Sequence, residues 1–179
     1  MNINKSGQRK IMAPSTVISE ENLASAAAFL LMLVATLIKV PFYPVPFTLQ
    51  TIVLPLLCFF LPRKPILKGL ALFALYRTMQ RGFGITLTIG YIAGFFLMAY
   101  ILTAKTWERS FFKVLVKILT TQLIVLITGT CVLALSIGVT KAFVCGFLFF
   151  LPAEILKAVI IMGIYKLFPL RFKNSRMER

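Results

Sequence analysis

The sequence predicts an all-α integral membrane protein, and three observations lead to this fold class. Hydrophobic residues make up 59% of the chain, charged residues make up 14%, and the mean hydropathy is +0.91, whereas a soluble domain is about half apolar and a quarter charged. The apolar residues form about six runs separated by helix-breaking segments. Basic residues gather between those runs, mainly on one side. We therefore expect six transmembrane helices with both termini in the cytoplasm.

One domain should cover residues 1–179, with cytoplasmic tails at 1–22 and 168–179 and the six-helix bundle at 23–167. The apolar runs are about residues 23–40, 47–61, 66–79, 85–104, 114–137 and 142–167. At 1.5 Å per residue the second and third runs extend only about 21–24 Å, which is less than the hydrocarbon thickness of about 30 Å. We expect these two to be short spans enclosed by other helices, or one of them to be partly irregular.

Proline and glycine mark the boundaries between the runs. The segment Pro41–Pro46 holds three prolines, which exclude a regular helix and predict a stiff, extended loop. Pro62–Pro65 ends the second run and Gln80–Gly84 ends the third. Gly138–Lys141 predicts a tight turn before the sixth run.

The distribution of Lys and Arg predicts the orientation. With the N-terminus inside, 15 of the 20 basic residues lie in cytoplasmic segments and Lys157 lies within the membrane. The four external residues are Lys39, Arg77, Arg81 and Lys141. This bias follows the positive-inside rule and accounts for the net charge of +15. We therefore expect contact with anionic membrane lipid and no role in binding nucleic acid.

Several classes of chemistry are disfavoured by what the chain lacks. It contains no histidine and no aspartate, and it has no glycine-rich loop of the GxxxxGK type. A metal site would have to be built from Glu and Cys alone, and no serine has a paired base for nucleophilic catalysis. We expect no enzyme activity, no metal and no cofactor.

The segment "FFLPAEILKAV", Phe149–Val159, carries two charges in one of the most apolar parts of the chain. Glu154 lies near the centre of the sixth run, where a charge costs roughly 3 kcal/mol on insertion scales. The i, i+3 spacing places Lys157 on the same helical face, so both should face the bundle interior. The pair is either a structural ion pair or a ligand or proton site. An acceptor beside a donor suits a ureido ring or an amide.

Two further segments carry candidate binding residues. In "PFYPVPFTLQT", Pro41–Thr51, the aromatic residues could cover a pocket and the polar ones could bind within it, although a plain inter-helix turn is the alternative. The candidates here are Tyr43, Phe47, Thr48, Gln50 and Thr51. In "TIGYIAGF", Thr88–Phe95, Gly90 and Gly94 form a small-xxx-small face that favours close helix packing, and Tyr91 between them offers a flat ring and a hydroxyl.

Ala24 and Ala28 form a second small-xxx-small face, in "LASAAAF". This face either packs within the bundle or docks another subunit, and the residues alone leave both alternatives open.

Together, "VPFTLQT" (Val45–Thr51), "GYIAGF" (Gly90–Phe95) and "FLPAEILKA" (Phe150–Ala158) resemble the signatures of the BioY family, in the same order and spacing over about residues 20–170. These are the biotin-specific substrate-capture subunits, or S components, of energy-coupling factor (ECF) vitamin transporters. The resemblance implies a six-helix protein of the bacterial cell membrane that binds biotin from the outer side. It also implies that Glu154 and Lys157 line the biotin site, with the loop after the first helix covering it.

The resemblance further implies partners. Ala24 and Ala28 would meet the transmembrane coupling subunit, which joins two ATPases that energise transport. The chain departs from the family pattern in two places: Ala153–Glu154 stands where Gly-Asp is usual, and the stretch Leu75–Thr88 is shorter and more basic. Alternatives are an S component for another small vitamin, or a non-transporting membrane scaffold.

Overall fold

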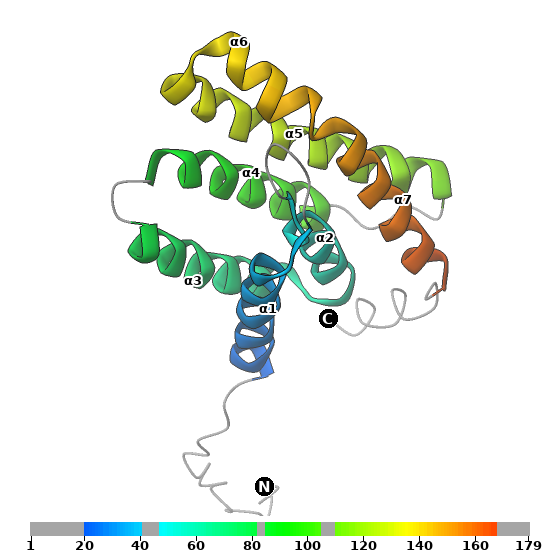
Figure 1. The fold of residues 1–179 in the computed structure, drawn as a ribbon. Helices are drawn as coiled ribbons and strands as arrows, with labels where there is room; N and C mark the ends of the chain where they lie inside the picture. The colour runs from blue at the N-terminus through cyan, green and yellow to red at the C-terminus, as the bar shows by residue number, and fades with distance from the viewer. Residues whose placement is uncertain (1–19, 41–46, 82–84, 105–109, 168–179) are drawn as a thin grey trace, which may run out of the picture.

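The computed structural model describes residues 20–40, 47–81, 85–104 and 110–167, and nearly all of them are helical (Figure 1). The elements in chain order are α1 (Glu20–Leu37), β1 (Lys39–Val40), β2 (Phe47–Thr48), α2 (Gln50–Phe60), α3 (Arg63–Arg81), α4 (Ile85–Ala104), α5 (Phe111–Ile137), α6 (Val139–Ala142), the π-helix η2 (Phe143–Leu148) and α7 (Leu151–Leu167). The all-α expectation is confirmed over these residues, apart from the two short strands.

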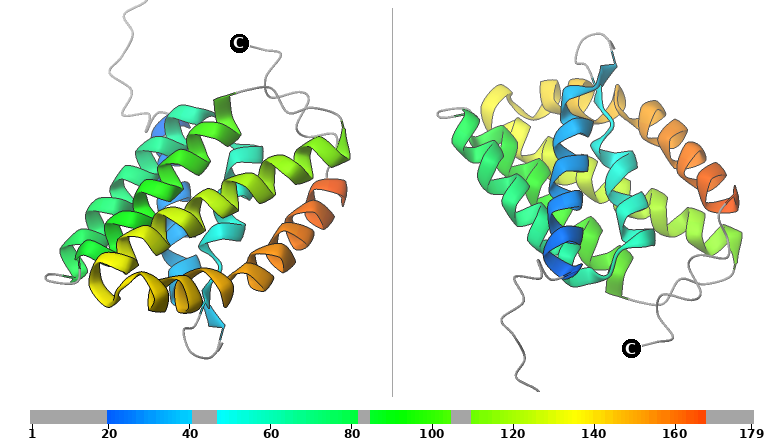
Figure 2. Two further views of the ribbon diagram at one scale, coloured as in Figure 1. Left: turned by 90° about the horizontal axis from the view of Figure 1, so that it is seen from above. Right: turned by 90° about the horizontal axis from the view of Figure 1, so that it is seen from below.

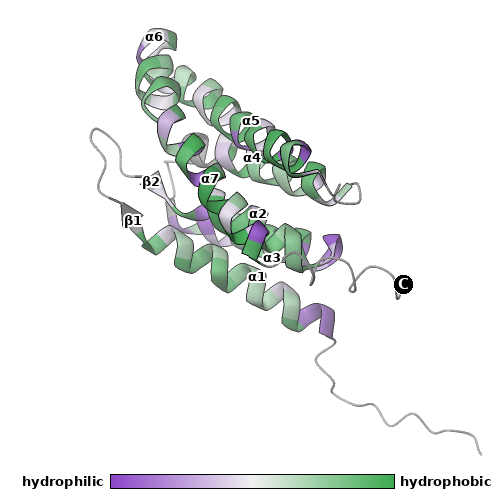
Figure 3. Ribbon diagram, turned by 90° about the vertical axis from the view of Figure 1, so that its right-hand side faces the viewer, coloured by the Kyte–Doolittle hydropathy of each residue, from purple (hydrophilic) through white to green (hydrophobic). Residues whose placement is uncertain are grey.

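Three helical segments of the described chain are long and apolar enough to cross a membrane by length and composition. They are Glu20–Leu37, Phe111–Ile137 and Val139–Leu167. Two shorter apolar helices, Gln50–Phe60 and Ile89–Ala104, lie among them. Large apolar side chains are exposed along the longer helices, among them Leu31 of α1, Leu135 of α5 and Val159 of α7. Figure 3 shows the predominantly hydrophobic colouring of the helices. A surface of this kind is suited to lipid.

A short hairpin replaces helix at the first boundary. We expected helix from residue 23 to residue 40 and again from residue 47, but α1 ends at Leu37 and α2 begins at Gln50. Between them, β1 and β2 pair antiparallel, with Lys39 opposite Thr48 and Val40 opposite Phe47. Inter-strand bonds satisfy the backbone where the prolines prevent a helix. The proline-rich residues 41–46 lie outside the described part.

Small residues allow the helices to approach closely. Gly69 of α3 faces α1, and a Cβ added there would lie 2.8 Å from Ala28 Cβ. Gly90 and Gly94 of α4 face α5, where added Cβ atoms would lie 2.8 Å from Val132 Cβ and Val125 Cα respectively. The packing interpretation of the two α4 glycines is therefore confirmed. These contacts place α3 beside α1, and α4 between α3 and α5 (Figure 1).

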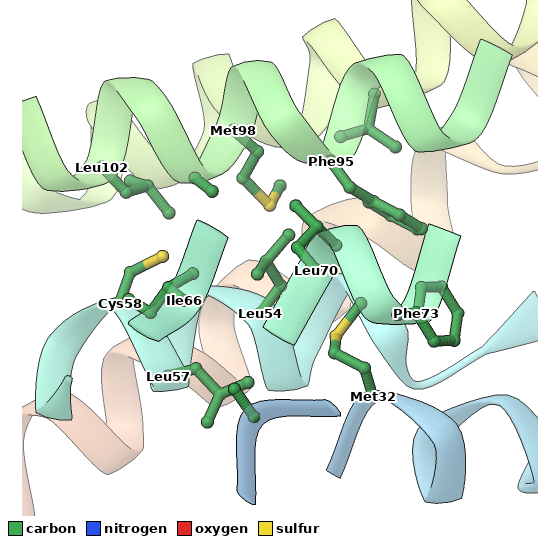
Figure 4. Packing of buried hydrophobic residues seen from close by; sticks show 13 residues of the cluster. Met32, Leu54, Leu57, Cys58, Ile66, Leu70, Phe73, Phe95, Met98 and Leu102 are labelled. Atoms are coloured by element: carbon green, nitrogen blue, oxygen red, sulfur yellow. The ribbon is translucent and has the colours of Figure 1, made fainter. Parts of the chain in front are cut away.

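Two apolar clusters form the core. The larger one joins α1, α2, α3 and α4 (Figure 4), and its labelled members are Met32, Leu54, Leu57, Cys58, Ile66, Leu70, Phe73, Phe95, Met98 and Leu102. The second joins α2, α5 and α7 and consists of Phe59, Val114, Ile118, Ala158, Ile161 and Met162. We call the second cluster the α2–α5–α7 plug. Both clusters contain residues of α2, and both also contain residues of α5, since Val125 belongs to the larger cluster.

The sixth apolar run is not one regular helix. Gly138, with φ of 86°, makes the turn alone, and helix resumes at Val139 rather than after Lys141. The chain then passes through η2 and a turn at Phe149–Phe150 before α7 begins. Pro152 has no N–H and its ring clashes with the carbonyl of residue 148, four positions earlier. The widened π-helical turns end at that residue, and Glu154 consequently lies in the first turn of α7.

Two side-chain contacts near helix ends agree with helices that alternate in direction along the chain. Lys68 Nζ of α3 lies 2.5 Å from Glu21 Oε1 of α1, so these helices begin at the same end. The guanidinium of Arg63, at the start of α3, lies 4.2 Å from the ring centroid of Tyr100, near the end of α4. The hairpin and α6 lie at the other end (Figure 2). The first of these ends is the one that the basic residues predict to be cytoplasmic.

Candidate functional site

The site is centred on the ion pair of α7. Lys157 Nζ lies 2.6 Å from Glu154 Oε1, and the two side chains are only 4% and 8% exposed. The expectation that the i, i+3 spacing brings the two charges together in the bundle interior is confirmed. A buried pair of this kind is not by itself a strong source of stability, because desolvation offsets the attraction.

Thr51, at the start of α2, connects the two charges. Its hydroxyl donates to Glu154 Oε1 at 3.3 Å and accepts from Lys157 Nζ at 2.9 Å. The side chain is buried, at 8% exposure. The sequence indicates Thr51 only as a polar residue at a helix start, and the structure shows that it belongs to the charged cluster.

A third helix, α5, contributes Gln122 to the cluster, a residue that the sequence alone did not single out. It is 1% exposed, and its Nε2 donates to the carbonyl of Thr51 over a long 3.4 Å. Within α2 that carbonyl would normally bond the N–H of residue 55. Residue 55 is a proline, which has no N–H and leaves the carbonyl open to another donor. The sequence signal that could have indicated Gln122 was an amide side chain within the apolar run of α5.

Two acceptor oxygens of this cluster are buried without a hydrogen-bond partner among the described residues. They are Glu154 Oε2 and Gln122 Oε1. Buried polar atoms of folded proteins are nearly always paired, and an unpaired one costs about 1–3 kcal/mol. The geometry therefore offers two acceptors to a bound molecule that carries N–H or O–H groups.

The α2–α5–α7 plug lies on one side of this polar cluster, on the same three helices. Its residues come after Thr51 along α2, before Gln122 along α5 and after Lys157 along α7. Because α5 runs against α2 and α7, all of these positions lie toward one end of the bundle. It is the end predicted to be cytoplasmic, so the apolar plug separates the polar cluster from that side.

Tyr91 lies on the seam between α4 and α5. Its half-buried ring packs on Gly129 so closely that a Cβ at Gly129 would lie 2.6 Å from the ring carbon Cζ. Gly129 is about two turns along α5 from Gln122. The structure places Tyr91 against the larger apolar cluster, and a role in binding stays a prediction.

The polar residues before Thr51 join helices rather than the charged cluster. Thr48 Oγ1 donates to Gln50 Oε1 at 2.9 Å, and Gln50 Nε2 donates to Thr36 Oγ1 at 2.7 Å. Thr36 in turn donates to the carbonyl of Met32. The amide nitrogen of Gln50 therefore ties the start of α2 to the end of α1, and its amide oxygen ties α2 to β2. Their participation in ligand binding remains a prediction.

The aromatic lid is only partly within the described chain. The backbone of Phe47 pairs with Val40 in the hairpin, which lies at the end of the bundle where α2 and α4 begin (Figure 2). Tyr43 lies outside the described residues. The lid therefore stays a prediction.

The two α1 alanines differ in environment. Ala28 is 1% exposed and packs against Gly69 of α3, whereas Ala24 is half-buried. For Ala28 the structure favours packing within the bundle over docking, because α3 covers its side chain. No group of three or more His, Cys, Asp or Glu residues lies together in the described ranges.

Apolar helices around a buried cluster of donors and acceptors define the class: an α-helical membrane protein with a buried polar cluster inside the bundle. A family model described as the BioY family matches residues 9–174. The chain belongs to the BioY family, as the three sequence motifs indicate. No curated protein and no solved structure gives a significant match to the chain. The family consists of biotin-specific S components of ECF transporters.

Proposed function

We propose that this protein captures biotin at the outer face of the membrane and releases it inside as the S component of an ECF transporter. The observation that carries the proposal is the buried cluster of Glu154, Lys157 and Thr51 in a BioY family member, with Glu154 Oε2 unpartnered. Biotin combines an apolar bicycle with a ureido group that has both N–H donors and a carbonyl acceptor. The cluster offers complementary groups inside an apolar bundle.

In the proposed complex, the Glu154 carboxylate accepts from the ureido N–H and Lys157 donates to an oxygen of the ligand. Such charge-assisted hydrogen bonds are the stronger kind, and burial strengthens them further. Tyr91, with the aromatic residues Tyr43 and Phe47, covers the apolar ring and chain. Thr48 and Gln50 line the entrance where α2 begins.

Transport itself requires partners. A transmembrane coupling subunit with two ATPase subunits energises the cycle in a bacterial cell membrane. The plug on the cytoplasmic side of the polar cluster supports entry of the ligand from the opposite side. A coupling subunit that approaches α1 meets its exposed face, which Ala24 borders, because α3 covers Ala28.

The direct test is binding of labelled biotin to the purified protein in lipid nanodiscs. We expect saturable binding, strongly weakened in Glu154→Gln and in Lys157→Met. Lys166→Met, which removes an exposed charge from the same helix, serves as the control and should bind normally. Full binding by both site variants would refute the proposal.

Competition by other unlabelled vitamins separates biotin from the alternative substrates. Displacement of the label by another vitamin at lower concentration than by biotin would favour a different S component. Absence of saturable binding of every vitamin tested would favour a scaffold role. Uptake of biotin into cells that express the chain with and without a coupling module then measures the need for partners.

A further inference from the structure

We propose that Gln122 is a specificity-determining residue of the site, and that its amide oxygen and Glu154 Oε2 together accept the two N–H groups of a cyclic urea. This inference rests on the proposed function and deepens it. It assigns a role to the buried polar residue that α5 contributes. It also makes the two unpaired acceptors parts of one recognition element.

The orientation of the Gln122 amide follows from Pro55. The missing N–H of Pro55 leaves the Thr51 carbonyl as an acceptor inside the bundle. Only the NH₂ group of Gln122 can donate to it, and Nε2 does so at 3.4 Å. A flipped amide would set two oxygens against each other. The amide oxygen is therefore directed away from the Thr51 carbonyl and left as an acceptor.

The Glu154 acceptor is fixed through the same residue. The hydroxyl of Thr51 and the ammonium of Lys157 both bond to Glu154 Oε1, which leaves Oε2 for another donor. Thr51 thus holds Gln122 through its carbonyl and Glu154 through its hydroxyl. The two acceptors belong to residues that are 1% and 6% exposed as a whole, so water competes poorly for them.

Two buried acceptors select a ligand edge with two donors. A cyclic urea has two N–H groups, and each can pair with one acceptor. A lactam or a pyrimidine edge with one donor and one acceptor would pair with only one of the two protein oxygens and set the other against an oxygen or nitrogen lone pair. Sites that are built to hydrogen-bond a group discriminate strongly against analogues that lack it, because the buried polar atoms stay unpaired.

The test compares biotin with its two analogues that carry a methyl group on one or the other ureido nitrogen. Binding to the wild-type protein is measured in nanodiscs by competition with labelled biotin. We expect each methylated isomer to bind roughly tenfold to a hundredfold more weakly than biotin. An isomer that binds as tightly as biotin would show that one N–H has no acceptor, which overturns the proposal without any mutation.

Variants then assign one N–H to Gln122. Gln122→Met keeps the length of the side chain and removes the acceptor, and it should weaken biotin binding roughly tenfold to a hundredfold. Thr121→Val is the matched control, because the buried Thr121 hydroxyl donates only within its own helix in the hydrogen bonds described. In Gln122→Ala, which also leaves room for a methyl group, the penalty for one isomer should shrink while the penalty for the other persists.

The outcomes separate this inference from the proposed function. Wild-type protein that fails to bind biotin refutes both. Tight binding by wild type, with Gln122→Met equal to Thr121→Val, refutes the role of Gln122 alone. The role of Gln122 would also be refuted if both methylated isomers lost as much affinity, relative to biotin, in Gln122→Ala as in the wild-type protein.

Discussion

At the scale of single residues, the site depends on charges that the membrane interior disfavours. Glu154 and Lys157 are held at 2.6 Å and share Thr51, so each offsets part of the other's desolvation. Spacing alone predicted that they would meet. Whether the pair serves packing or ligand binding is a separate question, and the two roles respond differently to paired substitutions.

The double variant Glu154→Gln/Lys157→Met distinguishes these roles. Each single variant leaves a buried group without its partner and should lower the free energy of unfolding by about 3–5 kcal/mol. The double variant removes both charges, so it should be more stable than the sum of the single effects predicts, yet it should still fail to bind biotin. Thermal unfolding in detergent and labelled-biotin binding measure the two effects.

A double variant that binds biotin as wild type does would identify the pair as a packing device only.

At the scale of elements, helix packing decides which small residues are available to partners. Ala28 and Gly69 bring α1 and α3 into close contact, while Ala27, one residue earlier, is exposed. The spacing of Ala24 and Ala28 predicted a packing face, but only the position of α3 shows that Ala28 faces inward.

Substitution of neighbouring alanines tests this assignment. Ala28→Leu forces a larger side chain against Gly69 and should destabilise the isolated protein by about 1–3 kcal/mol through overpacking. Ala27→Leu adds the same volume to an exposed position and should leave the midpoint of thermal unfolding nearly unchanged. Equal midpoints for the two variants would contradict the α1–α3 contact.

Proline acts at the same scale in α2. Pro55→Ala restores an N–H to which the Thr51 carbonyl can bond, so Gln122 Nε2 has to share its acceptor. We expect weaker biotin binding than in wild type but a smaller effect than in Gln122→Met. The double variant Pro55→Ala/Gln122→Met should bind biotin no more weakly than Gln122→Met alone, because both changes act on the Gln122 amide. Additive losses in a binding titration would separate Pro55 from Gln122.

At the scale of the whole molecule, the bundle places its polar cluster between α2, α5 and α7 and closes one side with apolar residues. The distribution of its basic residues predicts the direction of the molecule in the membrane. The contacts of Lys68 with Glu21 and of Arg63 with Tyr100 group helix ends in the way that helices of alternating direction require. In this expected orientation, the plug faces the cytoplasmic side and the hairpin faces the outer side.

Cysteine labelling of intact cells tests the orientation. In a variant with Cys58, Cys131 and Cys145 replaced by alanine, Thr140→Cys should react with a membrane-impermeant thiol reagent from outside. Ser110→Cys, at the opposite end of α5, should react only after permeabilisation. Both positions are exposed. The reverse pattern would invert the proposed topology.

Much of this architecture could be predicted because it depends on local properties of the chain. Apolar runs and their breakers located the helices, and the i, i+3 spacing located the ion pair. The sixth run was less predictable. Pro152 indicated that a backbone carbonyl would lack its helical hydrogen bond. The π-helical turns of η2 also pack against α5, and the sequence does not reveal that contact.

The sequence by itself determined the membrane class, the family, the orientation expected from its charges and the pairing of Glu154 with Lys157. Only the tertiary structure decided that Thr51 and Gln122 complete the cluster, that Gln50 ties α2 to α1, and that Ala28 is covered. The physical reason is the range of the interactions. Hydropathy and helical spacing act within one segment, whereas each of these contacts depends on which face one helix presents to another far away in the chain.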